Sequence, residues 1–132
     1  MGVTDQARGQ TSKLIAVIED DESMQESLCD LVESAGIVAR CFGSVEEFLR
    51  YNLHCEFGCL IAEIQMPGMS GLELQARLKE EQCDIPIPII FIASKGGAGM
   101  RIQAMREGAV EFLARPLDYQ LLLKTVRDAL DL

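Results

Sequence analysis

The 132-residue chain has no tryptophan, a single histidine and few basic side chains. Its 12 lysines and arginines face 21 aspartates and glutamates, for a net charge of -9. This balance disfavours nucleic-acid binding, because contacts to phosphates need a basic surface. No apolar run is long enough to span a membrane, and the first residues contain no apolar signal-peptide core. We therefore expect neither a nucleic-acid partner nor a membrane span.

The cysteines lack the spacing of a metal or redox site. There are five of them, an odd number, with no Cys-x-x-Cys pair and only one histidine, so a zinc site is not expected. Cys29, Cys41 and Cys59 lie in apolar patterns, where a free thiol behaves as a small hydrophobic side chain. The cysteine pattern therefore favours reduced thiols and a cytoplasmic location.

Apolar residues are plentiful, at 48% of the chain, which is enough for one domain with a packed core. Residues 1–12 are polar and contain glycine, so we expect a disordered leader there and a single domain over residues 13–132.

Strand-like and helix-like segments alternate along the chain. Expected strands cover residues 13–18, 37–42, 59–63, 89–93 and 109–114. Expected helices follow them, capped by Ser23, Ser44, Ser70 and Asp118 in four cases and covering residues 100–107 in the fifth. We expect the second and third helices to end near Leu53 and Gln82. This alternation predicts an α/β fold with a doubly wound parallel sheet and helices on both faces.

Polar side chains stand where the expected strands end. Glu19 and Asp20 follow the first strand, Glu63 ends the third, Ala93 ends the fourth and Arg115 follows the fifth. The carboxyl ends of parallel strands converge, so three carboxylates and a guanidinium would meet there, and carboxylate oxygens favour Mg²⁺. The plainer alternatives are a solvated acidic loop after the first strand and, at Glu63, a strand leaving the core.

Four segments in this order resemble the receiver domain of bacterial two-component response regulators. They are residues 17–22 (VIEDDE), 66–71 (MPGMSG), 108–113 (GAVEFL) and 115–116 (RP). The resemblance runs from about Leu14 to Leu130 and is closest to receivers that precede a helix-turn-helix domain, which this chain does not contain. It implies a flavodoxin-like sheet of five strands in the order 2-1-3-4-5 with five helices, two on one face and three on the other.

The resemblance also implies roles for single residues. Glu19, Asp20 and Glu63 take the positions of metal-binding carboxylates, and the Gln65 carbonyl that of a backbone metal ligand. Glu63 also occupies the phosphoacceptor position.

Three further roles are carried over in the same way. Ala93 and Arg115 stand where receivers contact the phosphoryl group, and Phe112 stands where they have a switching aromatic residue. The Arg115–Pro116 peptide bond is expected to be cis.

Three of these positions depart from the family pattern. Glu63 is one methylene longer than aspartate, which moves its carboxylate by up to about 1.5 Å. Ala93 cannot hydrogen-bond a phosphoryl oxygen, and strand alternation would point the neighbouring Ser94 the other way. Arg115 replaces a compact ammonium with a planar fork, which we expect to hold Glu63 directly.

The leading hypothesis is a receiver that is degenerate at Glu63, has no enzymatic activity and controls transcription or another output through protein contacts. Its expected partners are a sensor histidine kinase or another signalling protein, and Mg²⁺ binding would be weak or absent. A homodimer surface is expected on the last helix, the fifth strand and the preceding helix of residues 100–107, where Met100 and Met105 could equally be core residues. The alternative is a working switch that takes a phosphoryl group at position 63. A flavodoxin-like cofactor binder is disfavoured, because no phosphate-binding glycine loop is present.

Overall fold

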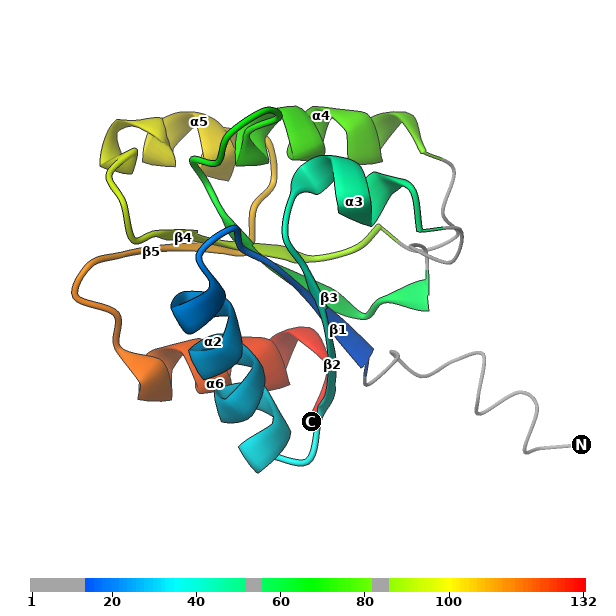
Figure 1. The fold of residues 1–132 in the computed structure, drawn as a ribbon, viewed down its shortest axis with the longest axis vertical. Helices are drawn as coiled ribbons and strands as arrows, with labels where there is room; N and C mark the ends of the chain where they lie inside the picture. The colour runs from blue at the N-terminus through cyan, green and yellow to red at the C-terminus, as the bar shows by residue number, and fades with distance from the viewer. Residues whose placement is uncertain (1–13, 52–55, 82–85) are drawn as a thin grey trace, which may run out of the picture.

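The computed structural model describes residues 14–51, 56–81 and 86–132 (Figure 1). In these residues five strands alternate with five α-helices: β1 (Leu14–Ile18), α2 (Glu22–Ser34), β2 (Val38–Phe42), α3 (Val45–Leu49), β3 (Cys59–Glu63), α4 (Gly71–Glu80), β4 (Ile89–Ala93), α5 (Arg101–Arg106), β5 (Glu111–Ala114) and α6 (Tyr119–Ala129). A short 3₁₀ turn, η2 (Ala98–Met100), precedes α5. This order confirms the alternation predicted from the sequence.

The strands form one sheet in the order β2-β1-β3-β4-β5, and all four neighbouring pairs are parallel. Both the predicted strand order and the parallel arrangement are therefore confirmed. Strands β1, β3 and β4 are almost wholly buried, which explains their near-continuous apolar sequences, because helices cover both faces of a doubly wound sheet.

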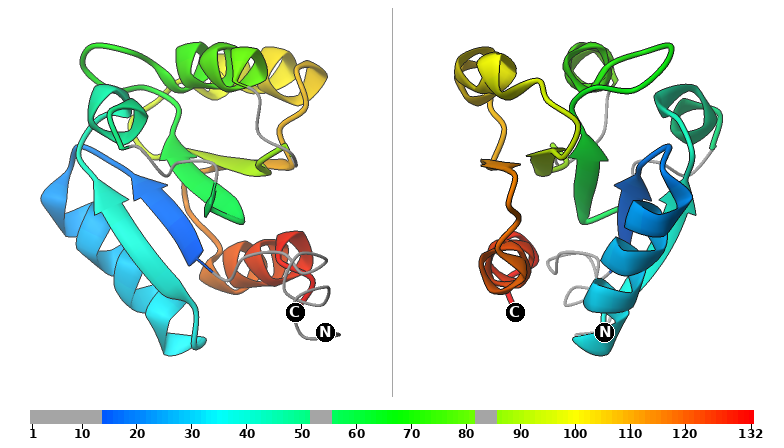
Figure 2. Two further views of the ribbon diagram at one scale, coloured as in Figure 1. Left: turned by 90° about the vertical axis from the view of Figure 1, so that its right-hand side faces the viewer. Right: turned by 60° about the vertical axis from the view of Figure 1, so that its left-hand side comes forward.

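Helices α2 and α6 cover one face of the sheet, and α3, α4 and α5 cover the other (Figures 1 and 2). Alternate residues of a strand supply the two cores. On β1, Ala16 and Ile18 belong to the cluster under α3, α4 and α5, whereas Ile15 and Val17 belong to the cluster under α2 and α6. The expected division into two and three helices is confirmed.

Side-chain caps fix where most helices begin. Ser44 and Ser70 accept hydrogen bonds from the amides three residues later, and Ser70 completes a capping box with Glu73. Asp118 caps α6 in the same way. The prediction of Ser23 as the first cap is wrong, because the Asp21 side chain accepts from the Met24 amide and starts α2 two residues earlier.

Some predicted boundaries differ from the observed ones. Helix α3 ends at Leu49 and α4 at Glu80, and the predicted ends near Leu53 and Gln82 lie outside the described residues. The expected leader, residues 1–12, lies outside them as well. Strand β5 begins at Glu111 rather than at residue 109, because the Ala109 amide still donates to the Ala104 carbonyl after α5.

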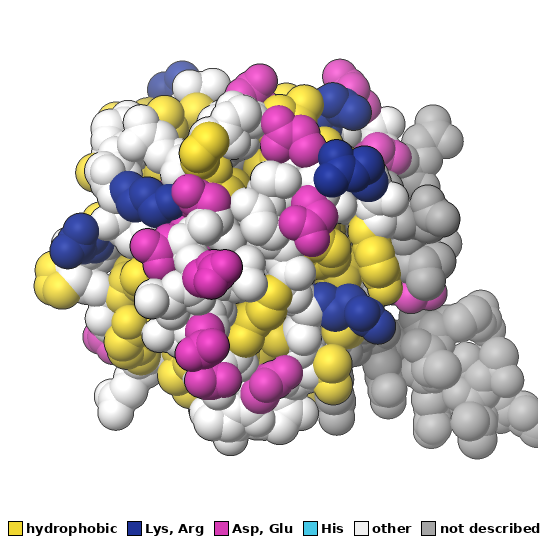
Figure 3. Space-filling view, in the orientation of Figure 1, with side chains coloured by type: hydrophobic (Ala, Val, Ile, Leu, Met, Phe, Trp, Pro, Cys, Tyr) yellow, Lys and Arg dark blue, Asp and Glu magenta, His cyan; other side chains and the backbone are white. Residues whose placement is uncertain are grey.

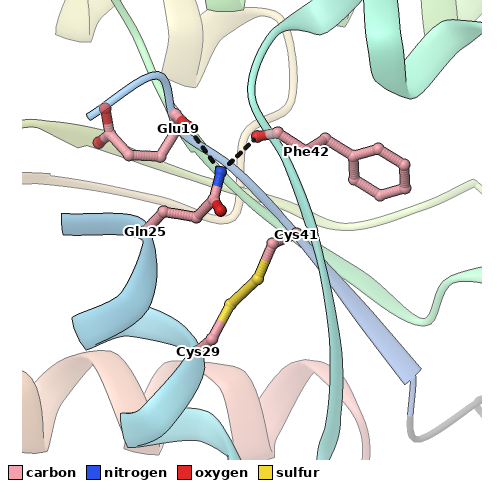
Figure 4. Close-up of a disulfide and its surroundings, with 5 residues drawn as sticks. All are labelled: Glu19, Gln25, Cys29, Cys41 and Phe42. Carbon is pink, nitrogen blue, oxygen red and sulfur yellow. Dashed lines mark hydrogen bonds between the residues drawn. A yellow bond between two sulfur atoms is a disulfide. The ribbon is translucent and has the colours of Figure 1, made fainter. Parts of the chain in front are cut away.

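A disulfide joins Cys29 of α2 to Cys41 of β2 (Figure 4). The interpretation of these two residues as free thiols is therefore wrong. The sequence pattern could not pair them, because helix packing brings α2 onto the neighbouring strand. Gln25 bridges the same interface, since its Nε2 donates to the carbonyl oxygens of Glu19 (2.9 Å) and Phe42 (3.1 Å).

The outer face of α2 is acidic. Glu22, Glu26, Asp30 and Glu33 are all exposed on this helix, and acidic side chains gather over it in the space-filling view (Figure 3). Among residues 14–51, 56–81 and 86–132, no helix has the length and apolar character needed to cross a bilayer.

Candidate functional site

Four neighbouring strands end side by side at one edge of the sheet. Glu63 and Ala93 are the last residues of β3 and β4, Glu19 directly follows β1, and Arg115 directly follows β5. The structure therefore brings the predicted site residues to one edge, as expected for strand ends in an open α/β sheet.

The Glu63 carboxyl group is fully buried and accepts hydrogen bonds from other residues of the chain. Its Oε1 accepts hydrogen bonds from both the amide (3.2 Å) and the hydroxyl of Ser94. Its Oε2 accepts from the amide of Gln65 at 3.4 Å. A buried carboxyl group without donors would be costly, so these bonds offset part of the cost of its burial.

The partner of Glu63 is Ser94, so two expectations are wrong. Ser94 does not point away, because β4 ends at Ala93 and the backbone bends there, so that strand alternation no longer applies. Arg115 does not pair with Glu63 either. Its Nη1 donates to the Ser94 carbonyl at 2.8 Å, and it therefore supports the segment that covers Glu63.

The acidic pair after β1 is neutralised from within the chain. The Lys95 ammonium contacts Asp20 Oδ1 and lies 3.4 Å from Oε2 of the fully buried Glu19. Glu19 Oε2 also accepts from the Asp21 amide at 3.1 Å, whereas Glu19 Oε1 is buried without a hydrogen-bond partner in the described structure.

Burial and charge set the pKa values of this cluster. Burial raises the pKa of Glu19 to about 7, against the opposing Asp21 hydrogen bond, and the nearby Glu63 adds to the rise. Burial alone would raise the pKa of Asp20, but hydrogen bonds with Lys95 and Glu19 and the positive charge of Lys95 together outweigh this effect and lower the pKa. The pKa of Lys95 is raised, because its bonds to the two carboxylates outweigh the lowering effect of burial.

Ala93 and Phe112 are both buried, and neither offers a polar side-chain atom to the site. The Phe112 ring lies beside that of Phe91, with centroids 6.5 Å apart, and its carbonyl accepts from Arg101 Nη1 at 2.7 Å. Packing therefore surrounds Phe112, and α5 is tied to β5 at this residue.

The profile of the response regulator receiver domain family matches residues 15–127 of this chain. The chain belongs to this family. It is 41% identical over 123 residues to the response regulator protein TodT of Pseudomonas putida, covering 92% of this chain and 52% of that protein. It is 40% identical over 116 residues to nodulation protein W of Bradyrhizobium diazoefficiens, covering 88% of this chain and 50% of that protein.

The chain thus spans about half the length of these curated relatives. Among solved structures, the crystal structure of a response regulator receiver domain protein from Clostridium thermocellum superposes with a TM-score of 0.80. It is 27% identical, and the match covers 89% of this chain and 94% of that one. In the present receiver the Arg115–Pro116 peptide bond is cis, which confirms the expectation from the resemblance.

Receiver domains typically bind Mg²⁺ at the phosphorylation site. The oxygens available for it here are largely engaged: Glu63 by Ser94 and Gln65, and the acidic pair by Lys95. Across the described residues, no three Asp, Glu, His or Cys side chains form a group that could hold a metal ion. In this arrangement the residues do not fit a bound divalent cation, because a lysine ammonium stands where one would pair with them.

Sequence reasoning missed the roles of Ser94 and Lys95, because it pointed the Ser94 side chain away from the site and assigned no role to Lys95. One signal was present. A hydroxyl and an ammonium directly follow the fourth strand, at the edge where the acidic residues of β1 and β3 were expected to meet.

Proposed function

We propose that this receiver domain acts through protein contacts and that phosphoryl transfer to position 63 is lost or severely weakened. The observation that carries the proposal is the buried Glu63 carboxyl group, whose oxygens accept hydrogen bonds from Ser94 and Gln65. Phosphoryl transfer depends on a nucleophile that is free and aligned with the donor, and here the carboxyl group is covered and displaced by an extra methylene. Receiver domains are generally signalling domains rather than enzymes, and we propose no catalytic activity for this one.

The proposed partners are a sensor histidine kinase or another signalling protein in the cytoplasm, and the proposed output is control of transcription or of another effector. Relatives of this chain are named as response regulator and transcriptional regulatory proteins, which supports this role. The acidic balance of the chain supports a protein partner rather than direct contact with nucleic acid.

A homodimer surface is proposed on α5, β5 and α6. Met100 and Met105 are less suited to this surface, because they are partly buried and pack against the core. Ile102 on α5 and Val110 before β5 are better candidates, with exposed fractions of 69% and 41%. Large exposed apolar side chains on adjacent elements favour an interface.

We further propose that Mg²⁺ binds weakly or not at all, with a Kd of about 1 mM or weaker. Glu19, Asp20, Glu63 and the Gln65 carbonyl remain the expected ligands if binding occurs. The Lys95 contacts to the acidic pair support weak binding, because a cation would have to compete with them.

The test is incubation with a small-molecule phosphodonor and Mg²⁺, followed by intact-mass measurement. We expect the protein to remain unmodified, and the triple variant Glu63→Asp/Ala93→Thr/Arg115→Lys to gain the mass of a phosphoryl group. The variant is the matched control, because it restores the family residues in the same fold. Addition of a phosphoryl group to Glu63 in the unaltered chain would establish the alternative, a working phosphorylation switch.

A further inference from the structure

Several contacts fix the position of Lys95. It therefore differs from a surface lysine whose side chain extends freely into solvent. The preceding residue, Ser94, donates to Glu63 of β3 and accepts at its carbonyl from Arg115 after β5. Lys95 itself extends to the acidic pair after β1, where it contacts Asp20 and Glu19. Two consecutive residues thus connect β4 with the ends of three other strands.

The backbone conformation after Lys95 keeps the loop close to the site. Gly96 and Gly97 have φ values of +113° and +83°, which side-chain-bearing residues rarely adopt. A Cβ on Gly97 would lie 2.9 Å from Cγ2 of Ile64, just past the end of β3. Both glycines therefore allow the loop to turn tightly against β3 while Lys95 reaches β1.

The carboxylates around Lys95 need a positive charge nearby. Glu19 is fully buried, Asp20 is 28% exposed in its side chain, and Glu63 lies in the same cluster. Carboxylates that are removed from water need a positive partner nearby. Arg115 does not supply it, because its Nη1 donates to a backbone carbonyl. Lys95 supplies it from a side chain that is 35% exposed.

Solvent reaches this place through a cavity of about 570 Å³ beside the site. Its lining includes Asp21, Ser94, Lys95 and Arg115. A small cation could therefore approach Lys95 from water without opening the fold.

We propose that Lys95 is a tethered cation for Glu19 and Asp20, and that a divalent cation such as Mg²⁺ binds there only by displacing its ammonium group. This inference rests on the proposed weak Mg²⁺ binding and assigns its cause to one residue. It also makes the loop after β4 sensitive to cations, because displacement of Lys95 releases one of the contacts that hold the loop.

The experiment is a Mg²⁺ titration of the unaltered chain, Lys95→Ala and Lys95→Gln, with binding monitored by amide NMR. Removal of a positive charge from the acidic pair should tighten Mg²⁺ binding by about tenfold or more in both variants. Adding Asp20→Asn to Lys95→Ala should abolish the gain. Lys79→Ala is the matched control, because Lys79 also pairs with a carboxylate, Glu107, but on the surface away from the site. It should bind as weakly as the unaltered chain.

A second measurement needs no substitution. The rate at which an amine-acylating reagent modifies Lys95 should rise severalfold when Mg²⁺ is added, while the rate at Lys79 stays constant. An unchanged Lys95 rate at saturating Mg²⁺ would overturn the inference even if the variants failed to fold.

The outcomes separate the two proposals. If the unaltered chain binds Mg²⁺ at micromolar concentration, both weak binding and the tethered cation are wrong. If the unaltered chain and both Lys95 variants bind equally weakly, only the tethered cation is wrong. Neither result depends on a phosphodonor, so the proposed loss of phosphoryl transfer is judged separately.

Discussion

Ser94 donates both its backbone amide and its side-chain hydroxyl to the same oxygen, Oε1, of Glu63. The hydroxyl that Ala93 lacks is thus supplied by the next residue, which lies outside the strand. The end of β4 is fixed to the end of β3 without any modification of the chain.

Replacing Ser94 with alanine should lower the free energy of unfolding by about 1–3 kcal/mol, because a buried oxygen loses one of its donors. Urea unfolding monitored by circular dichroism measures the change. Ser34→Ala is the matched control, since the Ser34 hydroxyl donates to the Leu31 carbonyl at an exposed position. Its effect should stay within about 0.5 kcal/mol. Equal losses of unfolding free energy in the two variants would show that the buried Ser94 hydroxyl stabilises the fold no more than an exposed serine hydroxyl does.

The Cys29–Cys41 disulfide should be found as a cross-linked peptide when the oxidised protein is digested without reductant. The double variant Cys29→Ala/Cys41→Ala should be less stable by about 2–3 kcal/mol, since the bridge closes a loop with a sequence separation of 12. Reductant should lower the unfolding midpoint of the unaltered chain but not that of the double variant. Alkylation of both thiols in the folded, oxidised protein would contradict the pairing.

Cys59 should be almost inert to alkylating reagents in the folded protein. Burial raises the pKa of its thiol to about 12, so at pH 8 the reactive thiolate is nearly absent and the sulfur is also inaccessible. Because the pKa is raised, reactivity should increase only as the pH rises towards 12. Mass spectrometry of the Cys59 peptide after iodoacetamide treatment, with and without urea, measures this protection. Rapid labelling of Cys59 at pH 8 in the absence of urea would refute the prediction.

Ile102→Glu should abolish any self-association through α5, because it places a charge on the most exposed large apolar side chain among the described residues. Sedimentation velocity at high micromolar concentration measures the oligomeric state. Val38→Glu is the control, because Val38 is 60% exposed but lies on β2, at the opposite edge of the sheet. A dimer that survives Ile102→Glu and dissociates with Val38→Glu would move the interface to that opposite edge.

The sequence by itself determined the architecture of this domain and the place of its site. Apolar runs of strand length, helix caps at Ser44, Ser70 and Asp118, and strict alternation of strands with helices leave little choice but a doubly wound parallel sheet. Because all strands of such a sheet point the same way, the convergence of Glu19 and Glu63 followed from their positions at strand ends.

Only the tertiary structure decided which side chains pair. Glu63 takes Ser94, which is 31 residues away, and Asp20 takes Lys95, which is 75 residues away. These choices depend on how the backbone bends after Ala93 and on separations of a few ångströms between neighbouring strand ends. The alternating side-chain directions of a strand do not extend past the last residue of β4. Strand periodicity therefore predicted the wrong direction for the Ser94 side chain and gave no role to Lys95. The disulfide between Cys29 and Cys41 has the same origin, because the packing of α2 against β2 brings together two residues that the one-dimensional pattern treats as separate core positions.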